Sequence, residues 1–243
     1  MRANLFPARI LRVKDAIRPN PTLFHYPGLT ARPWHEREAA PFNSWVHELE
    51  AATADITAEY LQVRAAGTPS DYLPGESDHN SELHTGGEWH WASFIDRGRR
   101  REEMWQRCPR TAAALQNVPS LCEGDMPFAF AFFSTLRPGG RIKPHCSPCN
   151  LRVRVHLPLI VPEGASCGIR VGSEARAWKP GKCLIFDDAF EHEVWNDGDQ
   201  ARVILLLDLW HWELEQEEIQ SIQEMFRVVE AKRDARQQSG SRS

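Results

Sequence analysis

From about residue 126 onward, apolar and polar residues alternate along the chain with a period of two. The alternating segments are rich in β-branched and aromatic residues and are separated by Pro, Gly and Asp: PFAFAFFSTL, LRVRVHLPLIV, CGIRV, KCLIFDD, HEVWN and ARVILLLDLW. This pattern is typical of β-strands. Many short strands at roughly ten-residue spacing predict a sandwich or jelly-roll barrel over about 126–212.

The flanking parts of the chain show helical spacing instead. Residues 43–65 place apolar side chains three or four positions apart, with Asn43 or Ser44 as a possible cap, and this predicts an amphipathic helix. We also expect a loop at 67–87, a shorter helix at 110–117, a C-terminal helix at about 213–235 and a disordered polar tail at 236–243. Because there is no internal repeat or long linker, we interpret 1–235 as a single domain whose part before about residue 120 is helical.

Composition and charge narrow the class of protein. The chain has 243 residues, 42% hydrophobic and 26% charged, which is ordinary for a globular protein. A formal net charge of −4 argues against nucleic-acid binding. The strongly apolar runs are far shorter than the roughly 20 residues that span a bilayer, and the N-terminus lacks the apolar core of a signal peptide. We therefore expect a soluble cytoplasmic protein without a membrane anchor.

The segment 151–161 has two unlike faces. Alternation places Leu151, Val153, Val155, Leu157, Leu159 and Val161 on one face, and Arg152, Arg154 and His156 on the other. The polar face could simply be solvated. Alternatively, it could line a cleft, where two guanidinium groups and an imidazole would suit a ligand with more than one carboxylate.

A second polar pair flanks the turn at Asp197-Gly198. If His192 and Arg202 belong to one hairpin, a two-residue turn places their side chains on opposite faces of the sheet, and a three-residue loop with a bulge places them on the same face. Joint function of the two residues then requires an odd-length connection.

The stretch HCSPC offers two further chemistries. A zinc site needs four nitrogen or sulfur ligands, but Cys146 and Cys149 have no second closely spaced pair, since Cys167 and Cys183 stand alone. A thioredoxin-like redox motif needs a βαβ unit, and none is indicated. His145 remains, and with His192 it makes two imidazoles on separate strands. That set suits Fe(II) with open positions for substrate and oxygen.

The segments STLRPGGRIKPHCSPCNLRVRVHLPL and WKPGKCLIFDDAFEHEVWNDGDQARVILLLDLWHWEL resemble the aspartyl/asparaginyl β-hydroxylase family of Fe(II)/2-oxoglutarate oxygenases. YPGLTARPW, EWHWASFIDRGRR and CPRTAAAL resemble its flanking elements, so the resemblance covers roughly 24–214. It implies a double-stranded β-helix (a jelly-roll or cupin-like barrel), with Fe(II), the cosubstrate 2-oxoglutarate and O2 as cofactors.

The resemblance also implies roles for individual residues. His145 and His192 match the two iron-binding histidines, and Arg202 matches the arginine that holds the distal carboxylate of 2-oxoglutarate, assisted by Ser134. Arg154 and His156 match a further pair at the cosubstrate. Substrate-binding positions are matched by Arg152, which faces the substrate carboxylate in the animal enzymes, and by Trp89 in the substrate cleft.

Ser147 stands two residues after His145, where most 2-oxoglutarate oxygenases place an iron-binding carboxylate. We expect water to complete the site, because two neutral imidazoles and the 2-oxoglutarate dianion already balance Fe(II). Glu191 and Glu193 should point away from His192 on a strand, and Asp187 and Asp188 should fix the preceding turn or orient a ligand histidine.

Other departures from the family concern the substrate and the compartment. His84 and Phe132 replace two cations of the animal enzymes, which weakens the case for the same acidic substrate. Ala112 replaces one cysteine of their disulfide, which is consistent with a reducing compartment. The family's membrane anchor and helical repeats are not matched, so we expect a free-standing catalytic domain.

These observations predict a 2-oxoglutarate-dependent dioxygenase that hydroxylates the β-carbon of an Asp- or Asn-like residue, in a peptide, a protein or a small amino acid derivative, with release of succinate and CO2. Two alternatives remain. One is an oxygenase of the same fold that acts on another acceptor, such as a lipid or another free amino acid. The other is a catalytically silent 2-oxoglutarate-binding module.

Overall fold

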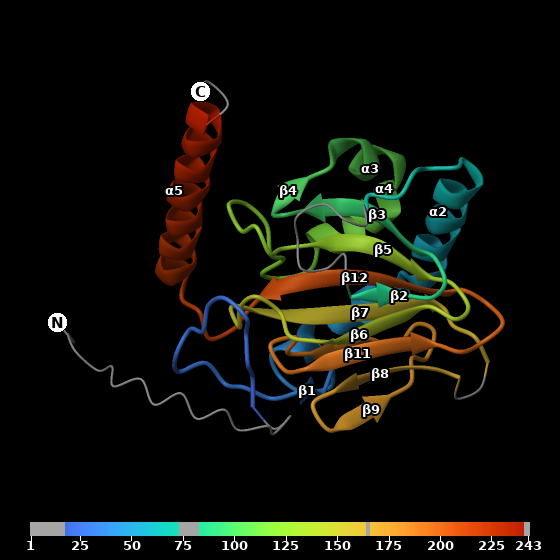
Figure 1. Cartoon of the computed structure of the whole chain (residues 1–243). Coiled ribbons are helices and arrows are strands. Elements are labelled where there is room, and N and C mark those ends of the chain that lie inside the picture. Colours follow the sequence, from blue (N-terminus) through green and yellow to red (C-terminus); the bar gives the residue numbers. More distant parts are fainter. Residues whose placement is uncertain (1–17, 73–82, 164–165, 241–243) are drawn as a thin grey trace.

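The computed structural model describes residues 18–72, 83–163 and 166–240. Two antiparallel sheets face each other (Figure 1). The seven-stranded sheet runs in the order β1 (Trp34–His35), β10 (Leu184–Phe186), β7 (Arg152–Ile160), β12 (Arg202–Trp210), β5 (Ala131–Leu136), β3 (Trp89–Asp96), β4 (Arg99–Arg100). The five-stranded sheet runs β2 (His84–Thr85), β6 (Arg141–His145), β11 (His192–Asn196), β8 (Cys167–Val171), β9 (Glu174–Arg176).

From β5 onward the chain crosses repeatedly between the sheets. β5, β7, β10 and β12 lie in the seven-stranded sheet, and β6, β8, β9 and β11 lie in the other. This order is that of a double-stranded β-helix, so the predicted fold class is confirmed. One detail differs, because among the described residues no strand of one sheet pairs with a strand of the other. The barrel is therefore an open sandwich, closed by side chains and not by backbone hydrogen bonds.

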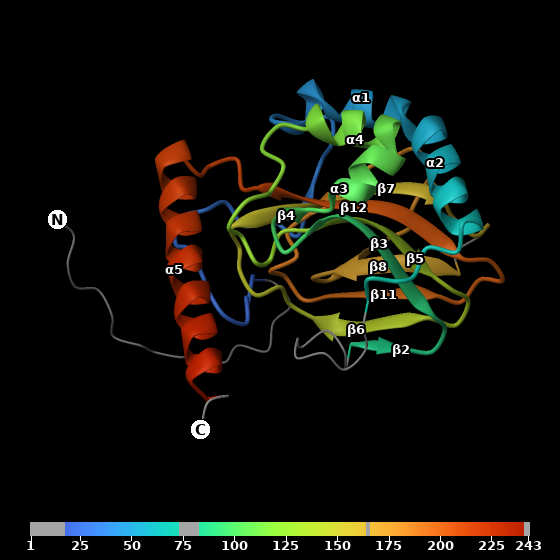
Figure 2. The ribbon, with the colours of Figure 1, turned by 90° about the horizontal axis from the view of Figure 1, so that it is seen from above.

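Short helices cover the outer face of the seven-stranded sheet (Figure 2). They are the 3-10 turn at Phe42–Ser44, α1 (Val46–Ala51), α2 (Thr53–Ala65), α3 (Glu102–Arg107) and α4 (Pro109–Gln116). The helix predicted at 43–65 is thus divided at Ala52. The Thr53 hydroxyl donates to the Glu50 carbonyl over 2.5 Å, a local bond that competes with regular helix geometry.

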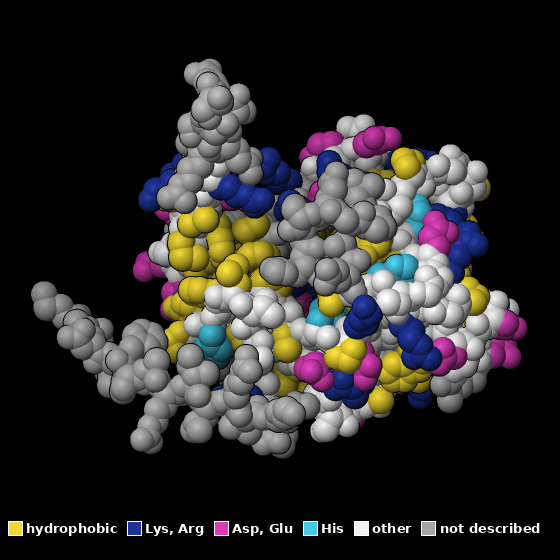
Figure 3. Space-filling view, in the orientation of Figure 1, with side chains coloured by type: hydrophobic (Ala, Val, Ile, Leu, Met, Phe, Trp, Pro, Cys, Tyr) yellow, Lys and Arg dark blue, Asp and Glu magenta, His cyan; other side chains and the backbone are white. Residues whose placement is uncertain are grey.

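The C-terminal helix α5 (Gln216–Gly240) stands beside the sandwich. Its Ile219, Ile222 and Phe226 pack into a small apolar cluster with Trp210 and neighbouring side chains. The helix continues to Gly240, so its end lies inside the segment for which we predicted disorder; residues 241–243 lie outside the described part. In Figure 3, hydrophobic side chains gather at the lower part of α5 and beside it. Met225, Val228 and Val229 of this helix are exposed.

Two cores lie on the two faces of the seven-stranded sheet. One joins this sheet to the helices and includes Val153, Val155, Leu157 and Leu159, so these four residues of the predicted apolar face are buried there. The other core lies between the sheets and includes Phe132, Phe186, Ile169, Ile204 and Leu206. The candidate site interrupts this second core.

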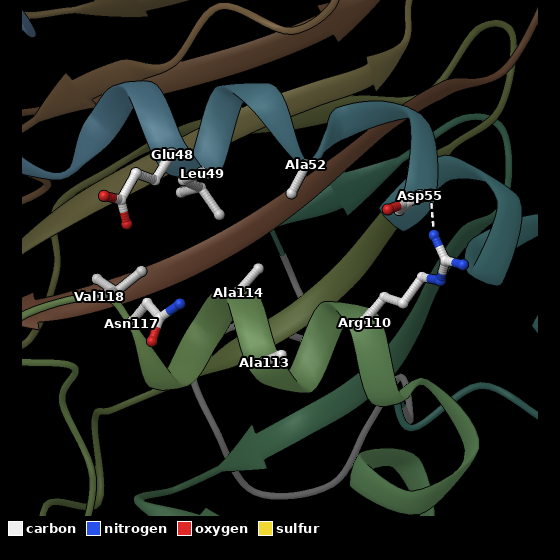
Figure 4. Close-up of a pocket in the computed structure, with 9 residues that line it drawn as sticks. All are labelled: Glu48, Leu49, Ala52, Asp55, Arg110, Ala113, Ala114, Asn117 and Val118. Atoms are coloured by element: carbon white, nitrogen blue, oxygen red, sulfur yellow. Dashed lines mark ion pairs between the residues drawn. The ribbon is translucent and has the colours of Figure 1, made fainter.

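A shallow groove lies in the helical layer, between α1, α2 and α4 (Figure 4). Leu49, Ala113 and Val118 line it, and Arg110 reaches across to Asp55 in a 2.5 Å ion pair. None of the site residues predicted from the sequence lies there.

Among the described residues, no helix combines the length and the apolar character that a membrane span requires.

Candidate active site

A pocket between the two sheets gathers most of the predicted site residues. It is lined by Trp89, Ser134, Ile142, His145, Arg154, His156, Ile169, Phe186, His192, Val194, Arg202, Ile204 and Leu206. The polar members come from strands β3, β5, β6, β7, β11 and β12. Because the sheets face each other, side chains far apart in the sequence converge on one cavity.

His145 and His192 lie side by side within the five-stranded sheet. They are directly paired residues of β6 and β11, and their ring centroids are 4.1 Å apart. His145 Nδ1 lies 2.8 Å from the Lys143 carbonyl, and His192 Nδ1 lies 2.9 Å from the Phe190 carbonyl. A carbonyl oxygen can only accept a hydrogen bond, so each Nδ1 must carry the proton, and each Nε2 presents a lone pair. A metal ion binds to such nitrogens.

Burial keeps both imidazoles neutral. Desolvation lowers the pKa of His145, and it lowers the pKa of His192 well below the ordinary value, with a further contribution from His145. Metal binding requires the neutral form, so no proton has to be removed near neutral pH.

Arg202 is a buried cation whose own contacts do not neutralise it. The side chain is 1% exposed, and its Nη1 donates to the Ser134 hydroxyl over 3.3 Å, while Nε has no hydrogen-bond partner. The guanidinium carbon lies 4.9 Å from the ring centroid of Trp178. Burial lowers the pKa of Arg202 to about 10. A buried guanidinium without a carboxylate partner is costly, and an anionic ligand would offset that cost.

The Ser134 hydroxyl is held in one orientation. Its oxygen accepts hydrogen bonds from Arg202 and from Trp89 Nε1, the latter over 3.0 Å. Both lone pairs are thereby used, so the hydroxyl hydrogen is available as a donor to a ligand.

His156 adds a second unpaired donor to the pocket. Its Nδ1 accepts from Trp178 Nε1 over 3.3 Å, which places the proton on Nε2, and that buried nitrogen has no partner. Burial, together with the charges of Arg202 and Arg154, keeps the pKa of His156 well below its ordinary value. Arg202 Nε–H and His156 Nε2–H therefore both suit a bound carboxylate.

The structure does not bring Arg152 into the pocket. Its side chain is 3% exposed and pairs with Asp208 over 2.6 Å and with Asp188 over 2.8 Å. Arg154 contacts the same two carboxylates, at 2.9 Å and 3.2 Å, and also lines the pocket. The contact that we predicted between Arg152 and a substrate carboxylate is not favoured by this geometry, because two aspartates already hold its guanidinium.

The acidic residues near His192 lie where we predicted from the alternation of side chains on a strand. Glu191 and Glu193 pair with Arg170 at 3.0 Å and 2.6 Å, away from the pocket. Asp188 belongs to the arginine cluster, and Asp187 accepts from the Ala189 N–H within the turn. Ser147 donates to the Cys149 carbonyl over 2.5 Å, so its hydroxyl closes the loop after His145.

The six cysteines are free thiols. Cys149 is buried in the cluster below α5, and Cys146 is partly exposed beside His145. Burial raises the pKa of each of these two thiols to about 11, so neither is a thiolate near neutral pH. Among the described residues, no group of three or more His, Cys, Asp or Glu side chains is placed to hold a metal ion.

The hairpin that we considered for His192 and Arg202 does not form. β11 and β12 belong to different sheets, and residues 197–201 cross between them. The two side chains meet because the inner faces of both sheets point into one pocket. Whether the connection has an odd or an even number of residues therefore does not decide if the two side chains meet.

The remaining predicted substrate residues lie in an aromatic wall, which we define as Tyr72, His84, Trp89 and Trp91. Trp89 is the member that lines the pocket; its ring centroid is 4.8 Å from Tyr72, 4.9 Å from Trp91 and 6.0 Å from His84. Phe132 packs against this wall, with its ring stacked on that of Trp91 and the two ring centroids 4.2 Å apart. Sequence reasoning missed Tyr72, Trp91 and Trp178, although the local richness in tryptophan was a signal.

The buried histidines should make the ligand-free protein less stable in acid. Burial lowers the pKa of His35 to about 4, and the pKa values of His145, His156 and His192 are also lowered. Below about pH 6.5 the unfolded chain binds protons that the folded chain does not, so stability falls as the pH falls.

Asp187 acts in the opposite direction, because burial raises its pKa to about 7, but it is one group against six histidines, since the pKa values of His84 and His211 are lowered as well. We expect the urea midpoint to decrease steadily from pH 7 to pH 5. His35→Gln should reduce that slope, and a slope of the opposite sign in the unmodified protein would contradict the burial of these imidazoles.

Residues 50–212 match the family described as Aspartyl/Asparaginyl beta-hydroxylase, which is more than half of the chain. The chain belongs to this family. The human aspartyl/asparaginyl beta-hydroxylase is 34% identical over 206 residues, 83% of this chain and 26% of the human protein. The chain thus spans about a quarter of that β-hydroxylase.

Other proteins are also similar to this chain. The mouse aspartate beta-hydroxylase domain-containing protein 2 is 32% identical over 85% of this chain and 59% of its own length. The ornithine lipid ester-linked acyl 2-hydroxylase of Rhizobium tropici is 35% identical over 68% of this chain and 56% of its own length. A solved prolyl hydroxylase from Trichoplax adhaerens has a TM-score of 0.44 and 14% identity, covering 74% of this chain and 91% of that one.

Proposed function

We propose that this β-hydroxylase family member is an Fe(II)- and 2-oxoglutarate-dependent dioxygenase. It hydroxylates the β-carbon of an Asp- or Asn-like residue or amino acid derivative and releases succinate and CO2. The observation that carries the proposal is the guanidinium of Arg202, which has no carboxylate partner and is buried in the same pocket as two neutral histidines whose Nδ1 atoms are engaged by backbone carbonyls. The pocket thus offers a metal-binding pair and a separate carboxylate-binding group, which is what a 2-oxo diacid and Fe(II) require together.

The donor set fits the metal and the cosubstrate. His145 and His192 would bind Fe(II) through Nε2, since both Nδ1 atoms are engaged by backbone carbonyls. Imidazole ligands suit iron, and a pair leaves open positions for substrates. Bound Fe(II) with 2-oxoglutarate would supply the oxidising chemistry, in which O2 is reduced as the keto acid loses CO2.

The protein's own side chains bind and orient the reactants. Arg202 Nε and the Ser134 hydroxyl donate to the distal carboxylate of 2-oxoglutarate, with His156 Nε2 as a further donor in the pocket. Trp89 fixes the Ser134 hydroxyl by donating to its oxygen. The apolar side chains around the site, Ile142, Ile169, Phe186, Val194, Ile204 and Leu206, exclude water and strengthen these polar contacts.

The test is succinate formation by protein loaded with Fe(II) under nitrogen, given 2-oxoglutarate and then oxygen. We expect turnover that stops without iron and is lost in His192→Ala, whereas His47→Ala, a change at an exposed helix position, retains it. The double change Cys146→Ser with Cys149→Ser should leave turnover in place. Binding of 2-oxoglutarate without any succinate would favour the silent binding module, and absence of binding would refute the proposal.

A further inference from the structure

Trp178 contacts two of the polar residues that line the pocket, although it is not itself among the described residues that line it. Its indole Nε1 donates to His156 Nδ1 over 3.3 Å, and the Arg202 guanidinium carbon lies over its ring, 4.9 Å from the ring centroid. The indole is buried. One side chain therefore holds the two groups whose remaining N–H bonds suit a carboxylate.

The connection between β9 and β10 fixes the indole in this place. Gly181 lies in this connection with a φ of +71°, and its N–H donates to the carbonyl of Pro158 on β7 over 2.9 Å. β10 then pairs with β7, with Leu184 opposite His156. Because the connection is tied to the strand that carries His156, the indole and the imidazole keep one relative position.

The indole decides which nitrogen of His156 carries the proton. An indole N–H can only donate, so His156 Nδ1 must accept and the proton of the neutral ring lies on Nε2. His145 and His192 are in the opposite tautomer, because carbonyl oxygens engage their Nδ1 atoms. The pocket thus has two imidazoles that present a lone pair at Nε2, which suits a metal ion, and a third that presents an N–H there, which suits an anion.

The same indole stabilises the charge of Arg202 without using its hydrogen-bond donors. The attraction between a guanidinium and an aromatic face offsets part of the cost of burial. A carboxylate partner would instead occupy the N–H groups, as Asp208 and Asp188 do at Arg154. Among the described residues Arg202 Nε has no hydrogen-bond partner, and Nη1 donates to Ser134. A ligand can therefore bind to Arg202 without displacing the ring that supports it.

We propose that Trp178 is a positioning residue for the distal carboxylate of a 2-oxo diacid. Its N–H keeps His156 a donor at Nε2, and its ring holds the Arg202 guanidinium with Nε free, so both donors are oriented before the ligand binds. Donors that are already oriented raise affinity, because less conformational freedom is lost on binding. The inference rests on the proposed function and adds a residue that acts on the cosubstrate through two others.

The experiment compares two ligands, 2-oxoglutarate and 2-oxopentanoate, in which a methyl group replaces the distal carboxylate. Both have the same 2-oxo acid end, so the ratio of their dissociation constants reports what the distal carboxylate contributes. The constants are measured by titration calorimetry with Fe(II)-loaded protein under nitrogen. Trp178→Phe keeps an aromatic face and removes the N–H. We expect it to weaken 2-oxoglutarate binding by about 3–10-fold and to change 2-oxopentanoate binding by less than about twofold.

Trp105→Phe is the matched control. Trp105 is also buried, its Nε1 donates to the Phe94 carbonyl over 2.8 Å, and the Arg100 guanidinium lies over its ring at 4.4 Å. It belongs to the core between the seven-stranded sheet and the helices, not to the pocket. This variant should lower the urea midpoint, as Trp178→Phe does, yet leave both dissociation constants unchanged.

A double variant tests whether the indole N–H acts through His156. His156→Phe removes the imidazole and keeps an aromatic ring. In that background we expect Trp178→Phe to weaken 2-oxoglutarate binding by less than about twofold, because the bond that it deletes is already absent. Full additivity of the two effects would overturn the role of the N–H.

The tautomers can be observed in the ligand-free protein without any variant. Nitrogen-15 chemical shifts of the histidine rings distinguish protonated from unprotonated nitrogens. We expect the proton on Nε2 in His156 and on Nδ1 in His145 and His192. A proton on Nδ1 of His156 would overturn the inference.

Failure of this inference differs from failure of the proposed function. The unmodified protein should bind 2-oxoglutarate more tightly than 2-oxopentanoate. If it does, but Trp178→Phe leaves the ratio of the two constants unchanged, the positioning role alone is overturned. If the unmodified protein binds both acids equally, or neither, the proposed function is overturned and with it this inference.

Discussion

Replacement of Arg202 by methionine is expected to weaken 2-oxoglutarate binding roughly 100-fold or more while leaving the ligand-free protein as stable as before, or more stable. The guanidinium is almost fully buried and has the Ser134 hydroxyl, but no carboxylate, as its hydrogen-bond partner. Methionine removes the cost of burying that charge and nearly fills its volume. The same change removes the group that would pair with the distal carboxylate.

Two measurements separate these effects. Titration calorimetry under nitrogen with Fe(II) present reports cosubstrate binding, and urea unfolding without either ligand reports stability. Arg141→Met is a matched control, because Arg141 is exposed and pairs with Asp197 on the surface. If Arg202→Met lowered stability by several kcal/mol yet left the affinity for 2-oxoglutarate intact, Arg202 would be a structural residue and the cosubstrate would lie elsewhere.

Asp208→Ala is expected to lower the free energy of unfolding by about 3–5 kcal/mol. The Asp208 carboxylate is fully buried and accepts from Arg152, from Arg154 and from the Phe130 N–H over 3.1 Å. Its removal leaves Asp188 alone to balance two buried guanidinium groups. It also leaves Arg154, which lines the pocket, without its closer carboxylate partner.

Asp197→Ala provides the comparison, since Asp197 pairs with Arg141 at the surface. Exposed pairs contribute about 0–1 kcal/mol, so its urea midpoint should hardly move. A similarly small effect for Asp208→Ala would show that water reaches the arginine cluster. The variant Arg152→Met should also destabilise, because it leaves the two aspartates facing Arg154 alone.

Much of the predicted fold and site rested on the alternation of apolar and polar side chains. In 151–161, the period of two separated the four central apolar residues, which face the helices, from Arg154 and His156, which line the pocket. The ends of the strand differ, because Leu151 and Val161 pack in other clusters and Arg152 pairs with two aspartates outside the pocket. Strand patterns are informative here because each side of the seven-stranded sheet meets a different environment. Helices on one side require continuous apolar contact, whereas the pocket on the other requires polar groups.

Contacts between neighbouring strands, and between strands and connections, could not be obtained from such local patterns. The partner of Arg152 is Asp188 on a different connection and Asp208 on β12, and nothing in the spacing of these residues indicates a shared cluster. The same reason explains the hairpin considered for His192 and Arg202. Alternation tells which face a residue occupies, but not which sheet lies opposite.

The repeated crossing of the chain between the sheets also has a kinetic consequence. Strands that are neighbours in the sequence from β5 to β8 do not pair with each other, and most pairs in this region join distant segments, such as β5 with β12 and β6 with β11. Chains dominated by such non-local pairs fold slowly, because long loops must close before contacts form. His145 and His192 come together only when β6 pairs with β11. A metal ion that needs both histidines, as in the proposed function, could therefore bind only after these two strands have paired, and it could not act as the nucleus of the fold.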